Sequence, residues 1–297
     1  MTRHLLEVDD LTPDELATVL DLAEDPQPEP VLAGKGMALV FQKPSARTRN
    51  SMEMAVVQLG GHPVSVRGDE VGIDTRETAE DVARTLACYH AAIGARVFSH
   101  GVLERMAAVS PVPVVNLLSD EAHPLQALAD LLTLRQAWGG FKGRALAYVG
   151  DGNNVCRSLG LAGALAGLDI RVATPPAYGV PPQHADRLKA LGAEVVETSR
   201  AAEAVDGADA VYTDVWASMG QEAEAAARRR AFEGFAVDER LMGAAAPGAL
   251  FLHCLPAHRG EEVAAAVVDG PASRVWEQAA NRMHAARGLL RFLVDAA

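Results

Sequence analysis

The chain has 297 residues, of which 49% are hydrophobic, and its formal net charge is −12. This length exceeds what one hydrophobic core usually organises, and the apolar content is sufficient for two cores. The acidic excess argues against a nucleic-acid partner, because binding to a phosphate backbone requires a basic face, although local arginines can still hold a small anionic substrate.

The N-terminal part of the chain predicts an α/β domain. Its first helix begins at Thr12, which is the N-cap of a capping box closed by Glu15. A proline-rich loop follows, and then the apolar run MALVF at residues 37–41 indicates a short buried strand. Further strands are expected near residues 63–66, 91–98 and 112–117, with helices between them.

A cluster of hydroxyl and guanidinium groups, SARTR at residues 45–49, follows this first strand. Apolar residues then recur at helical spacing up to Leu59, so the cluster begins a helix. There the first backbone N–H groups have no intrahelical partner and the dipole favours an anion, while arginine adds forked donors that match phosphate oxygens. The cluster therefore predicts a phosphate site, with a solvated basic turn capped by Ser45 as the alternative.

The second half of the chain predicts a parallel, doubly wound sheet of the Rossmann type. Five apolar segments are each followed by a turn or a helix-like stretch: RALAYVG, DIRVATP, AEVVET, ADAVYTDV and GALFLHCL. A helix at residues 123–134 bridges the two domains, and an amphipathic helix at residues 281–294 ends the chain. The expected fold class is therefore α/β, with two domains that are each a mainly parallel sheet flanked by helices.

The turn GDGNN at residues 150–154 follows the first strand of this second series, where a dinucleotide site could begin. However, the third glycine of a GxGxxG motif is missing, which disfavours a nicotinamide-dependent dehydrogenase. The amides of Asn153 and Asn154 suit a polar ligand instead, because an amide can bind both carboxylate and ammonium groups. The alternative is that an asparagine here only tolerates a left-handed turn, and this applies chiefly to Asn153.

Targeting segments and metal motifs are not recognisable in the sequence. The acidic start MTRHLLEVDD lacks the apolar core of a signal peptide and the Arg- and Ser-rich character of a transit peptide. The longest apolar run, at residues 159–168, is about half of the ~20 residues that a membrane helix needs. Cys88, Cys156 and Cys254 are scattered, without a CxxC pair or a histidine at ligand spacing. We therefore expect a cytoplasmic protein with no membrane partner and no structural metal.

Four motifs in a fixed order indicate a family. They are FQKPSARTR at residues 41–49, HPLQ at 123–126, DVWASMG at 214–220 and HCLP at 253–256. Together with GDGNN and the C-terminal QAANRMH, they resemble the ornithine carbamoyltransferases over nearly the whole chain. HPxQ is shared with aspartate carbamoyltransferases, whereas DxWxSMG and HCLP are those of the ornithine branch.

The resemblance implies transfer of the carbamoyl group of carbamoyl phosphate to the δ-amine of L-ornithine, giving L-citrulline and phosphate. No redox step occurs, so no cofactor is expected. The resemblance also implies a homotrimer or a multiple of trimers, and a role in arginine biosynthesis or a urea-type pathway. The expected domains are a carbamoyl-phosphate-binding domain at residues 1–122, completed by a returning C-terminal helix at 281–297, and an ornithine-binding domain at 123–280.

The same resemblance assigns site residues. Those expected to bind carbamoyl phosphate are Ser45, Ala46, Arg47, Thr48, Arg96, His123, Gln126, Cys254, Leu255 and Arg282. Within this set the expected catalytic residues are Arg96, His123, Cys254 and Arg282. His123 would donate to the carbonyl oxygen, and Gln126 would bind the carbamoyl amine through its amide oxygen. Those expected to bind ornithine are Asn154, Asp214, Ser218 and Met219, with Asp214 pairing with the α-ammonium group.

Several of these residues also have simpler explanations. His123 could serve only to begin a helix, and Arg96 and Arg282 could form salt bridges between the domains. His253 could be a packing residue, and residues 221–235 could be either a mobile lid or an ordinary solvated helix.

The chain departs from the family pattern at two places. Ala46 stands where the family usually has threonine, which puts the affinity for carbamoyl phosphate in question. The loop at residues 67–76 cannot be matched to the family segment that reaches a neighbouring subunit, so no residue is assigned there. The alternative functions are a carbamoyltransferase for another acceptor, such as putrescine, acetylornithine or aspartate, and a non-catalytic ligand-binding relative.

Overall fold

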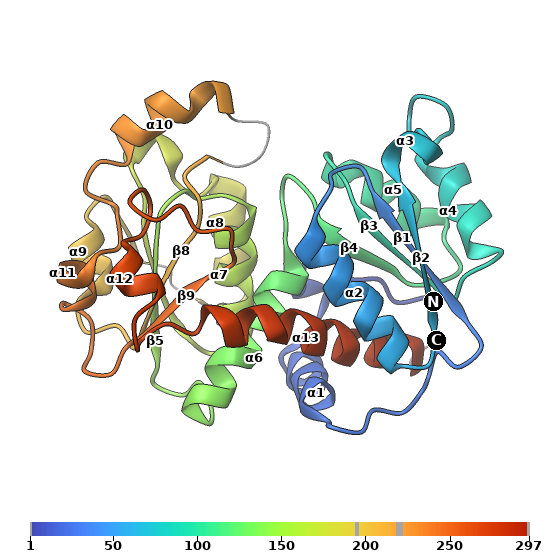
Figure 1. Cartoon of the computed structure of the whole chain (residues 1–297), viewed down its shortest axis with the longest axis horizontal. Helices are drawn as coiled ribbons and strands as arrows, with labels where there is room; N and C mark the ends of the chain where they lie inside the picture. Colours follow the sequence, from blue (N-terminus) through green and yellow to red (C-terminus); the bar gives the residue numbers. More distant parts are fainter. Residues whose placement is uncertain (1, 194–195, 218–221, 296–297) are drawn as a thin grey trace. The chain divides into compact units, whose positions relative to one another are not determined.

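The chain folds into two compact units. The computed structural model describes residues 2–193, 196–217 and 222–295. One unit comprises Met1–Leu132 with Ala280–Ala297, and the other comprises Thr133–Ala279. Each unit is a parallel sheet flanked by helices (Figure 1), so the predicted α/β fold class is confirmed.

The chain passes between the units inside two helices, α6 (Pro124–Trp138) and α13 (Val275–Asp295). The observed boundary after Leu132 therefore lies ten residues later than the expected one after residue 122. The difference arises because the first part of α6 packs with the first unit; for example, Gln126 accepts a hydrogen bond from Arg282 of that unit.

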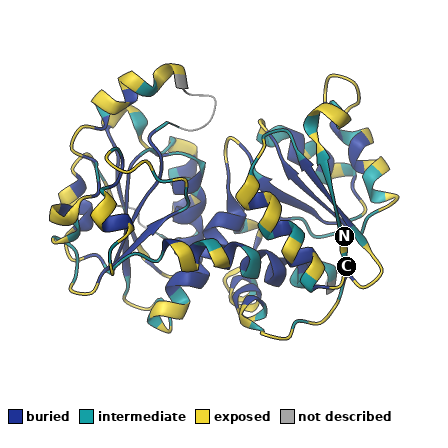
Figure 2. Ribbon diagram, viewed as in Figure 1, coloured by how far each residue is buried: buried dark blue, intermediate teal, exposed yellow. Residues whose placement is uncertain are grey.

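The first unit contains a four-stranded sheet in the order β2-β1-β3-β4, with all pairs parallel. Its strands are β1 (Gly36–Phe41), β2 (His62–Arg67), β3 (Ala92–Arg96) and β4 (Val114–Leu118). Its further elements are η1 (Val8–Asp10), α1 (Pro13–Glu24), α2 (Ala46–Gln58), α3 (Gly68–Val71), α4 (Ala79–Ala87) and α5 (His100–Val109). The centre of β1 and all of β3 are buried (Figure 2), which explains the unbroken apolar run of β1 and the small and apolar residues that precede Arg96 in β3. The predicted capping box of Thr12 and Glu15 at the start of α1 is confirmed.

The C-terminal helix α13 returns to the first unit and packs closely on α1. Gly288 permits this approach, because a Cβ atom there would lie 2.5 Å from the carbonyl oxygen of Val19 and 2.6 Å from the backbone nitrogen of Ala23. Arg287 secures the contact, since its Nη2 donates to the carbonyl oxygens of Ala23 (2.8 Å) and Asp25 (2.6 Å). The last turns of the chain thus belong to the same unit as the first strand.

The second unit contains a five-stranded parallel sheet in the order β7-β6-β5-β8-β9. Its strands are β5 (Ala145–Val149), β6 (Asp169–Ala173), β7 (Val196–Thr198), β8 (Ala210–Thr213) and β9 (Leu250–His253). Its further elements are α7 (Asn154–Ala166), η2 (Pro176–Tyr178), α8 (Pro182–Ala190), α9 (Ala201–Val205), η3 (Glu222–Glu224), α10 (Ala225–Ala231), α11 (Glu239–Met242) and α12 (Ala265–Val268). The strand order reverses between β5 and β8, and doubly wound sheets bind ligands beyond the carboxyl ends of the strands at such a point.

Aromatic side chains fill part of the core of the second unit. Phe232 is fully buried and stacks on Trp216, with ring centroids 5.5 Å apart. Phe235 and Phe251 belong to the same cluster. Trp216 is therefore a core side chain. Among the described residues, no helix combines the length and the apolar character needed to span a membrane.

Candidate active site

The predicted phosphate cluster does begin a helix, α2, which follows the carboxyl end of β1 (Figure 1). Ser45 is its N-cap, and its Oγ accepts a hydrogen bond from the backbone N–H of Thr48 at 3.3 Å. The hydroxyl of Ser45 also donates to Thr48 Oγ1 at 3.1 Å. Thr48 is buried, whereas Ala46 and Arg47 are exposed on the first turn. The local geometry is therefore that of a helix start suited to an anion.

Two buried arginines from distant parts of the chain meet at Thr48. Arg96 is the last residue of β3, and its Nη1 lies 3.4 Å from Thr48 Oγ1. Arg282, on α13, places Nη2 at 3.3 Å from the same oxygen and donates through Nη1 to Gln126 Oε1 at 2.6 Å. Two guanidinium groups this close repel each other, so a bound dianion would be strongly favoured here.

His123 lies beside this arginine group at the start of α6 and is almost completely buried. Burial lowers the pKa of His123 well below its usual value, and the positive charges of Arg282, Arg96 and Arg47 lower the pKa further. The imidazole is therefore neutral at pH 7, with one N–H that can donate to a carbonyl oxygen.

A second polar group lies in the other unit, where the carboxyl ends of β5, β8 and β9 meet. Asp214 follows β8 and is buried. Its Oδ1 accepts a hydrogen bond from the thiol of Cys254 at 2.9 Å, and its Oδ2 accepts one from Asn153 Nδ2 at 2.9 Å. The carboxylate is thus held by neighbours on both oxygens, at the sheet position where ligands of this fold bind.

Asn153 is the N-cap of α7, with its Oδ1 accepting from the backbone N–H groups of Val155 and Cys156 at 3.0 and 3.1 Å. Its φ of −75° lies in the ordinary region, so the interpretation as a left-handed turn residue is wrong. The contact with Asp214 comes from Asn153, whereas Asn154, the residue predicted to bind ornithine, is the first residue of α7. The N-cap role of Asn153 could have been predicted from the sequence, because asparagine is a preferred cap residue and an apolar helical segment follows it.

Two family models match the chain in the order of its two units. The model for the carbamoyl-P binding domain of aspartate/ornithine carbamoyltransferases matches residues 3–136. The model for their Asp/Orn binding domain matches residues 142–293. The chain belongs to the aspartate/ornithine carbamoyltransferase family. The family predicted from the ordered motifs is therefore confirmed.

Individual relatives agree with this assignment over the full length of the chain. An ornithine carbamoyltransferase of Acidothermus cellulolyticus is 52% identical over 100% of this chain and 98% of the relative. The structure of ornithine carbamoyltransferase from Pyrococcus furiosus matches with a TM-score of 0.95 and 43% identity, covering 100% and 98% of the two chains. An N-acetyl-L-ornithine transcarbamylase is also similar, at a TM-score of 0.87 and 30% identity over 98% and 99% of the chains.

Two of the residues predicted to bind ornithine, Ser218 and Met219, lie outside the described residues. The segment expected at 221–235 contains η3 and α10 where it is described. Arg228 on α10 anchors it, because its Nη1 donates to Asp151 Oδ2 at 2.7 Å and to the carbonyl oxygen of Trp216 at 2.9 Å. This arginine therefore ties the segment to the GDGNN turn.

Two groups of described side chains could hold a metal ion, although their spacing in the sequence matches no metal motif. Asp214, His253 and Cys254 have ligand atoms within 4.8 Å of one another, as do His258, Glu261 and Glu262. In the first group the atoms already take part in hydrogen bonds with protein neighbours. A divalent ion there would have to displace these bonds.

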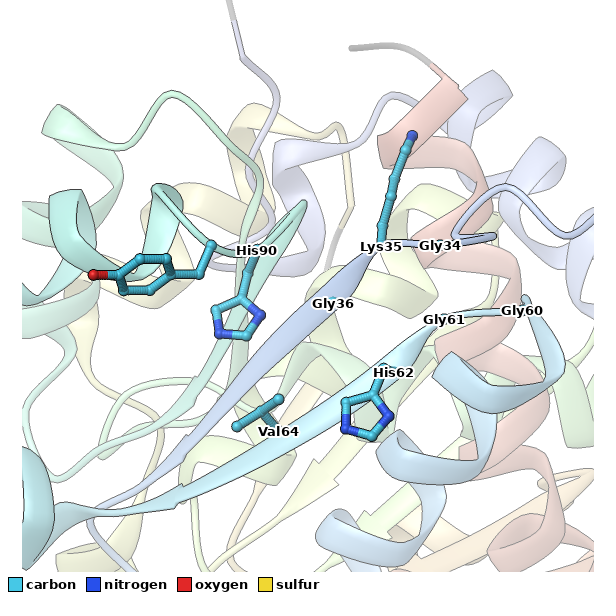
Figure 3. Close-up of a pocket in the computed structure, with 9 residues that line it drawn as sticks. Gly34, Lys35, Gly36, Gly60, Gly61, His62, Val64 and His90 are labelled. Atoms are coloured by element: carbon cyan, nitrogen blue, oxygen red, sulfur yellow. The ribbon is translucent and has the colours of Figure 1, made fainter.

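A separate pocket of about 560 Å³ lies at the amino ends of β1 and β2 (Figure 3). It is lined by Gly34, Lys35, Gly36, Gly60, Gly61, His62, Val64, Tyr89 and His90. Thr48 follows the carboxyl end of β1 and Arg96 is the last residue of β3 in the same sheet, so the pocket lies at the opposite edge. It is therefore distinct from the candidate active site.

Proposed function

We propose that this chain transfers the carbamoyl group of carbamoyl phosphate to the δ-amine of L-ornithine, giving L-citrulline and phosphate. The main support is the pair of polar groups in the two units of a carbamoyltransferase family member. The group at Thr48 is cationic and suits a phosphate, whereas the group at Asp214 is anionic and suits an ammonium. The two family models, for a carbamoyl-P binding domain and an Asp/Orn binding domain, agree with this division.

In the first unit, phosphate would bind at the start of α2. The first backbone N–H groups of the helix, including that of Ala46, would donate to the phosphate, with the hydroxyls of Ser45 and Thr48 beside them. Arg47 on the exposed first turn would close over the phosphate. Arg96 and Arg282 would neutralise the dianion and stabilise the negative charge that grows as phosphate leaves.

The carbamoyl group would be polarised by His123. A neutral imidazole can donate a hydrogen bond to the carbonyl oxygen. This hydrogen bond would become stronger as negative charge develops on the oxygen. Gln126 would orient the carbamoyl amine through its amide oxygen, which already accepts from Arg282 and has a second lone pair. The Nε2 of Gln126 donates to the buried Asp130 Oδ1 at 2.7 Å, so the amide cannot easily rotate.

In the second unit, Asp214 would pair with the α-ammonium of ornithine, with Asn154, Ser218 and Met219 at the amino-acid end. The δ-amine resembles a lysine, with an ordinary pKa of about 10.4, and must lose a proton before it attacks. Cys254 would lie near this amine. The contacts of Cys254 and Leu255 with carbamoyl phosphate stay predictions, as do the cytoplasmic location and the role in arginine biosynthesis.

We further propose that the protein is a homotrimer or a multiple of trimers. Exposed apolar side chains on α2, Met54 and Val57, support an interface on the first unit, because they are spaced one helical turn apart. Light scattering at micromolar concentration should report three chains or a multiple of three. A stable, fully active monomer would contradict the proposal.

The acceptor is tested by competition. Equal concentrations of ornithine, N-acetylornithine, putrescine and aspartate are incubated with carbamoyl phosphate and the enzyme, and the products are separated by chromatography. Citrulline should dominate, because Asp214 offers a counter-charge to a free α-ammonium and would leave a second carboxylate unpaired. A dominant product from another acceptor would leave only the carbamoyltransferase class, and no product at all would favour a non-catalytic relative.

A further inference from the structure

A buried carboxylate holds the HCLP loop, the segment of residues 253–256 that carries Cys254. Glu262 and His253 are both fully buried, with exposures of 0% and 1%. Glu262 Oε1 lies 3.2 Å from His253 Nε2 and accepts a hydrogen bond from the backbone N–H of His258 at 2.5 Å. One oxygen therefore contacts the chain on both sides of the loop.

The hydrogen bonds of His253 fix its tautomer. The backbone N–H of Leu255 donates to His253 Nδ1 at 2.9 Å, so Nδ1 must be without a proton. The ring proton is then on Nε2, where the carboxylate of Glu262 accepts it. A histidine of the other tautomer would present an N–H to the N–H of Leu255 and break this contact.

Leu255, which donates to His253, has a strained backbone conformation. Leu255 has a φ of +58°, a left-handed conformation that costs free energy in a leucine. Its neighbour Cys254 donates to Asp214 Oδ1, so a shift of the loop would move the thiol and disturb the carboxylate together. The backbone N–H of His253 is also fixed, because it donates to Gln278 Oε1 at 2.9 Å.

We propose that Glu262 is a positioning residue for the transfer reaction: it fixes His253 as the Nε2–H tautomer, and His253 then holds Leu255 and Cys254 in place. Glu262 contacts His253 and the backbone N–H of His258, and it reaches Leu255 and Cys254 through His253. The ring of His258 is half exposed, and its Nδ1 lies 3.6 Å from Oε2 of the buried Glu262, so it lies between Glu262 and the solvent. The inference rests on the proposed function, since it assigns a role within the same site.

Two substitutions separate positioning from simple support of the fold. Glu262→Ala removes the acceptor, and kcat/KM for ornithine should fall roughly ten- to hundredfold, as expected for a displacement of about 1 Å at reacting groups. Glu262→Gln keeps an oxygen that can accept from both His253 and His258, so its kcat/KM should stay within about threefold of wild type. Glu261→Ala, at the neighbouring carboxylate, is the matched control and should leave the reaction unchanged. All assays are run well below each variant's melting temperature.

The tautomer is measured in the wild-type protein, so the test does not depend on any variant folding. Nitrogen-15 NMR of histidine-labelled enzyme should show His253 with a bare Nδ1 and a protonated Nε2. A protonated Nδ1, wild-type kcat/KM in Glu262→Ala, or an equal loss in Glu262→Gln and Glu262→Ala would each overturn the proposal. A wild-type enzyme that makes no citrulline would instead refute the proposed function, which the NMR result does not touch.

Discussion

Arg47→Ala is expected to weaken carbamoyl-phosphate binding at least about a hundredfold while leaving the thermal melt nearly unchanged. The substitution removes charge-assisted donors at the start of α2, each worth about 1.5–3 kcal/mol when the partner is ionised. Arg47 is exposed, so little packing is lost and the fold should be spared. Isothermal calorimetry with carbamoyl phosphate measures the binding, and calorimetric melting measures the stability.

The chain offers a matched control two residues away. Arg49 lies on the same helix and forms an exposed ion pair with Glu53 at 2.8 Å. Such surface pairs contribute about 0–1 kcal/mol, so Arg49→Ala should change neither binding nor melting appreciably. Wild-type affinity in Arg47→Ala, or an equal loss in both variants, would show that the phosphate site has been assigned to the wrong side chain.

Asp214→Asn is expected to raise the KM for ornithine roughly ten- to hundredfold. It removes the charge proposed to pair with the α-ammonium, an interaction worth about 1.5–3 kcal/mol. It also places an amide N–H₂ opposite a donor, because Asn153 presents Nδ2 while its Oδ1 is occupied by the cap of α7. The amide N–H₂ of the new asparagine can instead face the thiol of Cys254, since a thiol can accept a hydrogen bond as well as donate one.

Steady-state kinetics with each substrate varied in turn tests this expectation. Carbamoyl-phosphate binding should be retained, because the proposed phosphate residues Ser45, Arg47 and Thr48 belong to the other unit. Asp169→Asn, at an exposed carboxylate of the same sheet, is the control for a simple loss of charge. An unchanged ornithine KM would mean that Asp214 serves the hydrogen bonds of Cys254 and Asn153 and not the substrate.

Much of the fold follows from local patterns in the sequence. The strand at β1, the capping box at α1 and the helix start at Ser45 are local features, because each depends on residues within a few positions of one another. The parallel, doubly wound character of the second sheet was predicted from its alternating strands and helices. The order of the motifs was sufficient to identify the family.

Contacts between distant residues were decided by the tertiary structure. Thr48 meets Arg282, 234 positions away, because α13 returns to the first unit, where Gly288 permits close packing on α1. Motif spacing could not show that Asn153 holds Asp214 or that Glu262 holds His253, because these contacts depend on side-chain rotamers and on which strand ends lie side by side. Because caps and hydrophobic periodicity are local, they were sufficient to predict the helices, the strands and the chemical groups of the site. Only the packed structure decided which groups share a hydrogen bond, since that requires atoms to lie within about 3 Å.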